Sequence, residues 1–317
     1  MGHKISIGLG LMGFIFSGAA AYWRWIDLCE ESGIDSLWQT DRLIGEQPHL
    51  ECLATMAALA GRTRRLKFGM NVLSLSQRDP VLVAKQCATI DVLSEGRLLP
   101  QFGVGSDRAP EWTVMNLDMK TRAARMDEGL EIIRRLWTED KVDFAGQHYR
   151  LSGASISPKP VQAELPMWIG GASEAAVRRT VRWGTGWHGG AEAPAIAGAV
   201  VAKVRAALPA AGRTIDADHY GAGFPFRFGK AEDDPDIGRS MQGYRDYRGL
   251  DPAGYFAIGD ADTIFERITE YVDAGVSKLV LRPHGRRDDD LMNQTRRLLR
   301  EVLPRVAARW PRSVAPS

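Results

Sequence analysis

The sequence predicts an α/β fold, a single (β/α)8 barrel that spans residues 1–317. Three observations predict it. Short apolar runs alternate with longer helical patterns along the whole chain, and the alternation can be counted eight times. The helical patterns carry ordinary start and stop signals, such as the Pro80 that opens one and the Gly33 and Gly61 that close two others. No Pro- or Ser-rich linker separates two halves, so one closed barrel accounts for all eight units.

The first half of the chain supplies four units. In the first predicted helix, Tyr22, Trp25, Ile26 and Cys29 follow the i, i+3, i+4, i+7 spacing of a buried face. The predicted strands are 5–11, 34–39, 66–73 and 98–104, and the helices are 19–31, 50–60, 80–93 and a long fourth marked by Met126, Leu130, Ile133 and Trp137.

The second half resumes after an interruption. Residues 139–165 contain VDFAGQHYRL, which predicts a small hairpin insertion turning at Ala145-Gly146. Residues 229–257 are polar, aromatic and rich in glycine, which favours a mobile lid. The remaining strands are expected at 167–169, around Trp187-His188, within 219–228 and at 278–282, with helices starting at Ser173 and Pro194 and spanning 262–274 and 291–306.

Charge and cysteine content restrict the function classes. The formal net charge is +2, so we expect neither nucleic acid nor a membrane surface as a partner. Cys29, Cys52 and Cys87 have no metal-ligand spacing and lie in apolar helical patterns, which favours free thiols in the cytoplasm.

The N-terminus contains weak matches to three other signals. Its first 21 residues resemble a short signal peptide, and Met1-Gly2 with Ser6 resembles a myristoylation site. Gly8, Gly10 and Gly13 match the dinucleotide pattern G-x-G-x-x-G, but only a short strand precedes them and the acidic residue comes late, at Asp41. Cleavage would leave seven strands, so we expect the segment to be the first strand of the barrel.

The stretch PMWIGGAS (166–173) ends a buried strand in Gly170-Gly171 just where a helix begins. A tight turn explains the glycines. An anion site also explains them, because a helix N-terminus exposes unpaired N–H groups and glycine lets a phosphate approach the backbone.

Several blocks resemble the bacterial-luciferase-like flavin- or F420-dependent oxidoreductases. They are IDSLWQTDRL (34–43), LKFGMNVLSLSQRDPVLVAKQCATIDVLSEGRL (66–98), GVGSD (103–107), RMDEGLEIIRRLW (125–137), PMWIGGASEAAVRRTVRWGTGWH (166–188) and YVDAGVSKLVLRP (271–283). The resemblance covers most of the chain in order, and it implies a luciferase-like barrel whose cofactor ring lies at the carboxyl-terminal mouth.

The resemblance also implies the cofactor-binding residues. Gly170, Gly171, Ala172 and Ser173 match the segment that holds the cofactor phosphate in the family. Asn71-Val72 matches a non-prolyl cis peptide beneath the ring. At the end of the fourth strand, Gly103 and Gly105 would let the ring lie close, and Ser106 would hydrogen-bond the ring or its phosphate chain, although a simple turn also explains this segment.

Asp41-Arg42 departs from the family pattern, because many relatives have Asp-His here and the histidine takes part in the chemistry. An arginine is no general acid or base near neutral pH, but it binds an anionic substrate or a developing oxyanion. A salt bridge from Arg42 to Asp41 or Glu46 is the structural alternative. His188 and Arg227 end predicted strands and complete the expected catalytic set, and the histidines show no metal-binding pattern.

These features predict an oxidoreductase. We favour a two-component monooxygenase in which a separate flavin reductase supplies reduced FMN, which reacts with O2 and oxygenates a small organic substrate. Coenzyme F420-dependent hydride transfer is the alternative, and Arg42 in place of histidine tilts the choice toward FMN. A non-catalytic flavin-binding barrel and, more remotely, a doubly wound NAD dehydrogenase also remain. From the resemblance we expect a homodimer or higher oligomer with contacts through helices 50–60 and 80–93.

Overall fold

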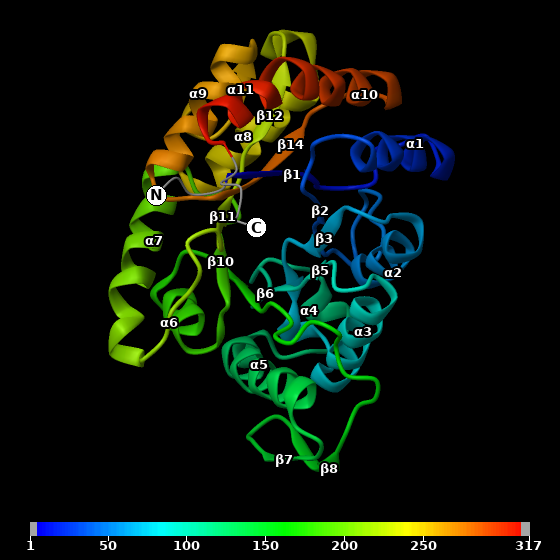
Figure 1. The fold of residues 1–317 in the computed structure, drawn as a ribbon, viewed down its shortest axis with the longest axis vertical. Helices are drawn as coiled ribbons and strands as arrows, with labels where there is room; N and C mark the ends of the chain where they lie inside the picture. Colours follow the sequence, from blue (N-terminus) through cyan, green and yellow to red (C-terminus); the bar gives the residue numbers. More distant parts are fainter. Residues whose placement is uncertain (1–4, 312–317) are drawn as a thin grey trace, which may run out of the picture.

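The computed structural model describes residues 5–311, and its central feature is a closed barrel of parallel strands (Figure 1). The strands are β1 (Ser6–Leu11), β2 (Ser36–Gln39), β3 (Lys67–Met70) continued by β4 (Leu73–Ser74), β5 (Leu98–Leu99) continued by β6 (Gln101–Gly103), β9 (Trp168–Gly170), β10 (Gly186–His188), β11 (Tyr220–Ala222) continued by β12 (Pro225–Phe228), and β14 (Lys278–Pro283). If each interrupted strand is counted as one, every strand pairs in parallel with the next along the chain. The last, β14, pairs with the first, β1, so the barrel predicted from the alternation is confirmed. β1 occupies the predicted first strand.

Helices cover the outside of the barrel, as the alternation predicted. They are α1 (Ala19–Glu30), α2 (Cys52–Arg62), α3 (Pro80–Leu93), α5 (Arg122–Thr138), α6 (Glu174–Trp183), α7 (Pro194–Ala207), α9 (Ala261–Asp273), α10 (Asp288–Arg297) and α11 (Leu303–Arg309). Within residues 5–311, one helical stretch, 194–211, is long and apolar enough to span a membrane. It includes α7, whose buried Val200, Val201 and Val204 belong to the hydrophobic core, as expected for an outer helix of a barrel.

The barrel interior explains the glycines of GLGLMG. A Cβ on Gly8 would lie 2.6 Å from the Ser36 hydroxyl oxygen, and a Cβ on Gly10 would lie 2.9 Å from a Val280 methyl and 3.3 Å from the Arg282 side chain. Both glycines therefore make room for large residues of neighbouring strands. Interstrand packing therefore accounts for Gly8 and Gly10 without a dinucleotide site.

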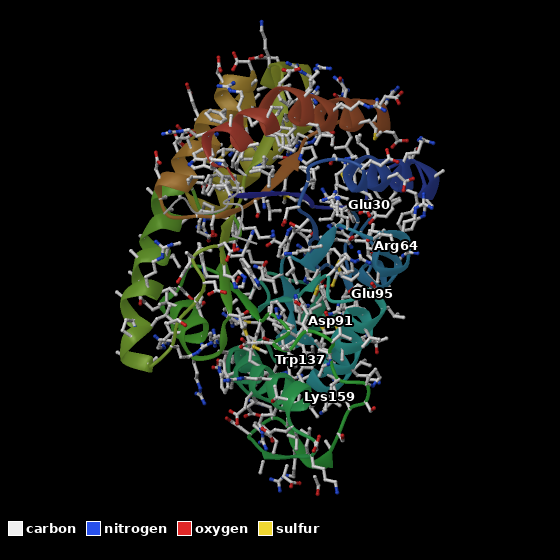
Figure 2. The ribbon with its side chains drawn as sticks, viewed as in Figure 1. Glu30, Arg64, Asp91, Glu95, Trp137 and Lys159 are labelled. Carbon is white, nitrogen blue, oxygen red and sulfur yellow. The ribbon has the colours of Figure 1, made fainter. Side chains whose placement is uncertain are left out.

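The insertion after α5 is the predicted hairpin, formed by β7 (Val142–Ala145) and β8 (Arg150–Ala154). In Figure 1 it projects beyond α5 at one end of the molecule. The segment after the hairpin is held by the buried carboxylate of Asp91, which accepts the Val161 and Gln162 N–H groups at 2.9 and 3.1 Å. The Trp137 indole donates to the Ala84 carbonyl of α3 at 3.0 Å, and Figure 2 shows Asp91 and Trp137 in this region.

Two helices were not predicted. The short α4 (Glu111–Val114) lies in the loop after β6. The segment 229–257, predicted as a lid, contains α8 (Pro235–Arg248), a 14-residue helix whose Ile237 and Tyr244 are buried. β13 (Ala257–Gly259) then pairs with β12. The predicted last helix is three consecutive pieces, with a π-helical turn over 298–302 between α10 and α11.

Candidate active site

The candidate site lies at the carboxyl ends of the strands. Three predicted site residues end strands there, Gly103 in β6, Gly170 in β9 and His188 in β10, and the charged Arg282 lies near the end of β14. A separate hollow of about 210 Å³ lies at the opposite end, beside Trp137, Met167 and Trp183. Barrel enzymes place their chemistry at the carboxyl ends, where eight loops converge, and use the other end for stability. We therefore assign the mouth, and not that hollow, as the site.

The Asn71–Val72 peptide is cis, as the family resemblance implied. It interrupts the third strand and turns the Val72 side chain across the mouth. A Cβ on Gly103 would lie 2.5 Å from Val72 Cγ2, and a Cβ on Gly170 would lie 2.5 Å from Val72 Cγ1. The two predicted glycines thus serve first to admit Val72, and the three residues form one surface at the ends of strands three to five. We call Val72, Gly103 and Gly170 the valine shelf.

The N-terminus of α6 lies directly beside the valine shelf. Gly171 has φ +102°, a conformation that side-chain-bearing residues rarely adopt, and its carbonyl accepts the Trp187 indole N–H at 2.8 Å. Ser173 caps the helix, accepting the Ala176 N–H at 3.2 Å. Among the described residues, the N–H groups of Ala172 and Ser173 meet no acceptor. The predicted phosphate segment therefore presents free donors at a helix N-terminus.

The end of the fourth strand is a turn with local contacts. Gly105 has φ +76°, and a Cβ there would lie 3.2 Å from Trp112 and 3.4 Å from the Gln77 amide nitrogen. The Ser106 hydroxyl accepts the Arg108 N–H at 3.2 Å, and its carbonyl accepts the Trp112 indole N–H at 2.7 Å. The buried amide nitrogen of Gln77 has no partner among the described residues, so one donor beside this turn is unsatisfied.

Asp41 and Arg42 do not pair with each other. The buried Asp41 carboxylate binds Arg78 at 2.7 Å and accepts the Ser74 N–H at 3.0 Å, which fastens the loop after β2 to the third strand. These contacts favour a positioning role for Asp41 over the predicted catalytic one. Arg42 is exposed, and among residues 5–311 no carboxylate lies within 4 Å of its guanidinium, so neither structural alternative for Arg42 is present.

Glu111 of α4 shapes the loop that carries Arg42. Its carboxylate accepts the Leu43 and Ile44 N–H groups at 3.0 and 3.2 Å. Burial opposes ionisation, but the backbone N–H of Glu111 itself, these two N–H groups and the nearby Arg42 outweigh it and hold the pKa of Glu111 below its usual value. The sequence analysis missed Glu111, because nothing in the pattern placed α4 against the loop after β2.

His188 and Arg227 lie in less accessible positions than their predicted roles require. His188 is fully buried and stacks on Trp38 with ring centroids 5.4 Å apart. Burial, with a smaller contribution from Arg282, lowers its pKa to about 3, so its ring is neutral. Arg227 pairs with Asp290 at 2.8 Å and with Asp234 at 3.6 Å. In this structure both residues are buried, and the catalytic roles expected of them stay predictions.

Arg282 is the charged residue that the sequence analysis missed. It is 8% exposed and lies at the carboxyl end of β14, above Val280 in the barrel interior. Burial lowers the pKa of Arg282 to about 10, so the guanidinium remains charged near neutral pH. The available signal was the run LVLRP, a cation within an otherwise apolar strand.

Two groups of acidic and sulfur or imidazole ligands lie close together in the described part of the chain. Arg78 lies against the first, Asp41, Glu51 and Cys52, and binds both carboxylates. The second, Asp216, Asp218 and His219, lies before β11, away from the mouth. Neither arrangement indicates a metal centre, since an arginine occupies one and two exposed acids dominate the other.

Fold and mouth together define a class: a (β/α)8 barrel whose carboxyl end offers a shelf, a set of free backbone donors and buried cations. Comparison with known proteins identifies the family. The sequence profile described as luciferase-like monooxygenase matches residues 17–236, and the chain belongs to that family.

Relatives extend this similarity over nearly the whole chain. The F420-dependent glucose-6-phosphate dehydrogenase of Amycolatopsis mediterranei (strain U-32) is 29% identical over 318 residues, covering 88% of this chain and 92% of its own. The monooxygenase RslO1 of Streptomyces bottropensis superposes with a TM-score of 0.81 at 20% identity, covering 96% of this chain and all of RslO1. An F420-dependent secondary alcohol dehydrogenase, solved with an F420–acetone adduct, superposes with a TM-score of 0.77 at 19% identity, covering 94% of this chain and 98% of its own. At these identities the structures show a shared fold.

Proposed function

We propose that this protein is an F420-dependent oxidoreductase that transfers hydride between the deazaflavin and a small organic substrate. The arrangement that carries the proposal is the valine shelf next to the free N–H groups of α6. A planar ring needs a flat apolar support, and a charged tail needs donors within reach of it. The mouth supplies both side by side, since Gly170 of the shelf is followed directly by the N-terminus of α6.

The choice of cofactor reverses the order favoured from the sequence. Reduced FMN ranked first there because Arg42 replaces the family's common histidine. Two sequence relatives that match over about nine-tenths of the chain are named for F420 and dehydrogenation, which supports the alternative more strongly. When bound, F420 supplies the hydride chemistry. In this chain the shelf would orient the ring, Ser173 and Ala172 would bind the phosphate, and Arg42 would bind an anionic group at the rim.

Reduced FMN with O2 stays as the second candidate, because Arg42 removes the histidine on which a copied deazaflavin mechanism depends. That candidate also requires a flavin reductase as partner, whereas F420 does not. A homodimer or higher homo-oligomer and a cytoplasmic location are expected under either candidate.

Titration of the purified chain with F420 and, separately, with FMN distinguishes them. We expect cofactor fluorescence to change and saturate with F420 at micromolar concentrations and to respond at least tenfold more weakly to FMN. A chain that binds FMN tightly and ignores F420 contradicts the proposal. A chain that binds neither supports the non-catalytic barrel.

A further inference from the structure

Arg282 is a buried cation whose hydrogen-bond partners are all neutral. Its guanidinium donates to the Gly190 and Gly223 carbonyls, each at 3.3 Å, and to the Tyr255 hydroxyl. Its Nε has no partner among the described residues, and no carboxylate in residues 5–311 lies within 4 Å of it. Three of the five N–H groups of the guanidinium are used, and two are left unused, one of them on Nε, in a place where water has little access.

Other buried cations of the same barrel are neutralised. Lys278 lies four residues earlier in β14 and pairs with Asp35. Arg227, on the neighbouring strand, pairs with Asp290 and Asp234. Lys278 and Arg227 thus each have a carboxylate partner, whereas Arg282 has none among the described residues.

The acid that comes nearest to balancing Arg282 is already engaged. Glu192, after β10, raises the pKa of Arg282 somewhat, but its carboxylate pairs with Arg248 of α8 at 3.2 Å. Arg282, Arg248 and Glu192 together carry one uncompensated positive charge. A buried charge without a partner is costly in any fold, and a site that receives an anion explains why one is retained.

Arg282 lies at the carboxyl end of the barrel interior, next to the mouth, and is covered in this structure. Its side chain lies beside Gly10, which has no side chain to cover it, and Val280 is the layer beneath it. Part of the cover comes from the segment 229–257, in which Tyr255 binds the Arg282 guanidinium and Arg248 of α8 binds Glu192. Movement of this segment would release the guanidinium from Tyr255.

We propose that Arg282 forms an anion subsite on the floor of the mouth, which binds the carboxylate or phosphate of the substrate beneath the segment that carries α8. Calling the ligand a substrate rests on the proposed function, whereas the anion subsite itself does not. Nε is free, and Nη2 would be released from Tyr255 when that segment moves. Together they offer the parallel donors that a carboxylate or phosphate accepts side by side.

The test compares Arg282→Met with Arg282→Lys and with Arg286→Met, an exposed arginine four residues away. All three are made in a Ser173→Asp background, so that the α6 donors do not bind the probe. The melting temperature is measured in sodium phosphate, sodium acetate and sodium chloride at equal ionic strength. We expect phosphate or acetate to raise it by roughly 2–4 °C over chloride in the background and in Arg286→Met. Arg282→Met should lose this shift and Arg282→Lys should keep part of it, because lysine retains the charge without the planar fork.

The subsite is refuted if Arg282→Met keeps the full anion-dependent shift, or if the Ser173→Asp background shows none. If Arg282→Met does not fold, the anion-dependent shift of Arg282→Lys is compared with that of the background instead. A second experiment measures KM in the presence of F420, in proteins that keep Ser173. It compares an anionic with a neutral substrate in two pairs, glucose 6-phosphate with glucose and lactate with 2-propanol. Arg282→Met should raise KM for the anionic member of an accepted pair by about 10- to 100-fold and leave the neutral member unchanged; equal effects on both contradict a substrate subsite. Absence of F420 binding in the wild type overturns the proposed function and leaves the anion result standing.

Discussion

Replacing Gly103 with alanine tests the valine shelf most directly. The three nearest atoms to a Cβ there all belong to Val72, at 2.5, 3.3 and 3.6 Å. Carbon atoms in ordinary contact lie about 3.5–4.0 Å apart, so the new methyl group overlaps Val72 Cγ2 by about 1 Å. Overpacking of this kind costs about 1–3 kcal/mol in the free energy of unfolding. We expect Gly103→Ala to be destabilised by that amount in urea denaturation.

A double-mutant cycle with Val72→Ala locates the cause. Removing the two Val72 methyl groups relieves the 2.5 Å contact and leaves only the 3.3 Å contact to Cβ, which a shift of a few tenths of an ångström accommodates. The double variant should therefore be about as stable as Val72→Ala alone, with a coupling of at least about 1 kcal/mol. Gly238→Ala is the matched control, because a Cβ on this helical glycine meets nothing within 4 Å, and it should be unchanged or slightly stabilised.

Cofactor affinity in the same variants separates packing from binding. If the Val72 side chain supports the ring, F420 affinity should fall in Gly103→Ala and stay low in the double variant although its stability recovers. Free energies that add within about 0.5 kcal/mol would refute the steric argument. Affinity that returns together with stability would show that Val72 does not support the ring.

Four other predictions follow from the mouth and its surroundings. Ser173→Asp keeps the helix cap but places a carboxylate at the phosphate donors, so F420 affinity should fall at least tenfold, whereas Ser173→Asn should bind nearly as the wild type; equal affinities would remove the phosphate from α6. Arg42→Ala should lower kcat/KM by about 10²–10³ with little change in F420 affinity, and an effect on melting temperature alone would make Arg42 structural. His188 has a folded-state pKa of about 3 against an ordinary value of 6.5, so the unfolded state takes up a proton first as pH falls. Stability should decline by about 2–3 kcal/mol between pH 7 and 4.5 on account of this residue, a slope that His188→Gln should lack. Leu82 and Leu93 of α3 are 58% and 60% exposed, and Leu82→Asp should shift an oligomer toward monomer in light scattering if α3 is the predicted contact.

Local sequence signals predicted the barrel because the apolar pattern and the start and stop residues of each strand–helix unit lie within about 30 residues of one another. Pro80 opens α3 as expected, and the Ser173 cap precedes α6. The α8 helix escaped prediction because its face is mostly polar and only Ile237 and Tyr244 are buried. Its contacts include the stacking of Tyr244 on Tyr255 and the ion pair of Arg248 with the distant Glu192, which no helical periodicity contains.

The site was predicted where a family motif exists and missed where a contact joins distant residues. The Asn71–Val72 bond belongs to a motif, and its cis geometry followed from the resemblance. The closeness of Val72 to Gly103 and Gly170 depends on the pairing of three strands, so the glycines were predicted for cofactor approach alone. Asp41 and Arg78 lie 37 residues apart, so no local pattern indicated the ion pair that holds the loop after β2, and the catalytic role expected of Asp41 stays a prediction.

The electrostatics of the mouth also bear on the choice of ligands. Its acids are engaged by cations of the chain: Asp41 binds Arg78, and Glu192 binds Arg248. Its positive features remain open, since the α6 N–H groups, Arg42 and Arg282 lack anionic partners among the described residues. The unpaired N–H groups of α6 and the guanidinium of Arg282 lie at different places in the mouth. This arrangement favours the binding of two separate anionic groups over the binding of one. A cofactor phosphate at α6 and an anionic substrate at Arg282 fill these positions with opposite charge, and a neutral substrate would leave the Arg282 guanidinium buried without a counterion.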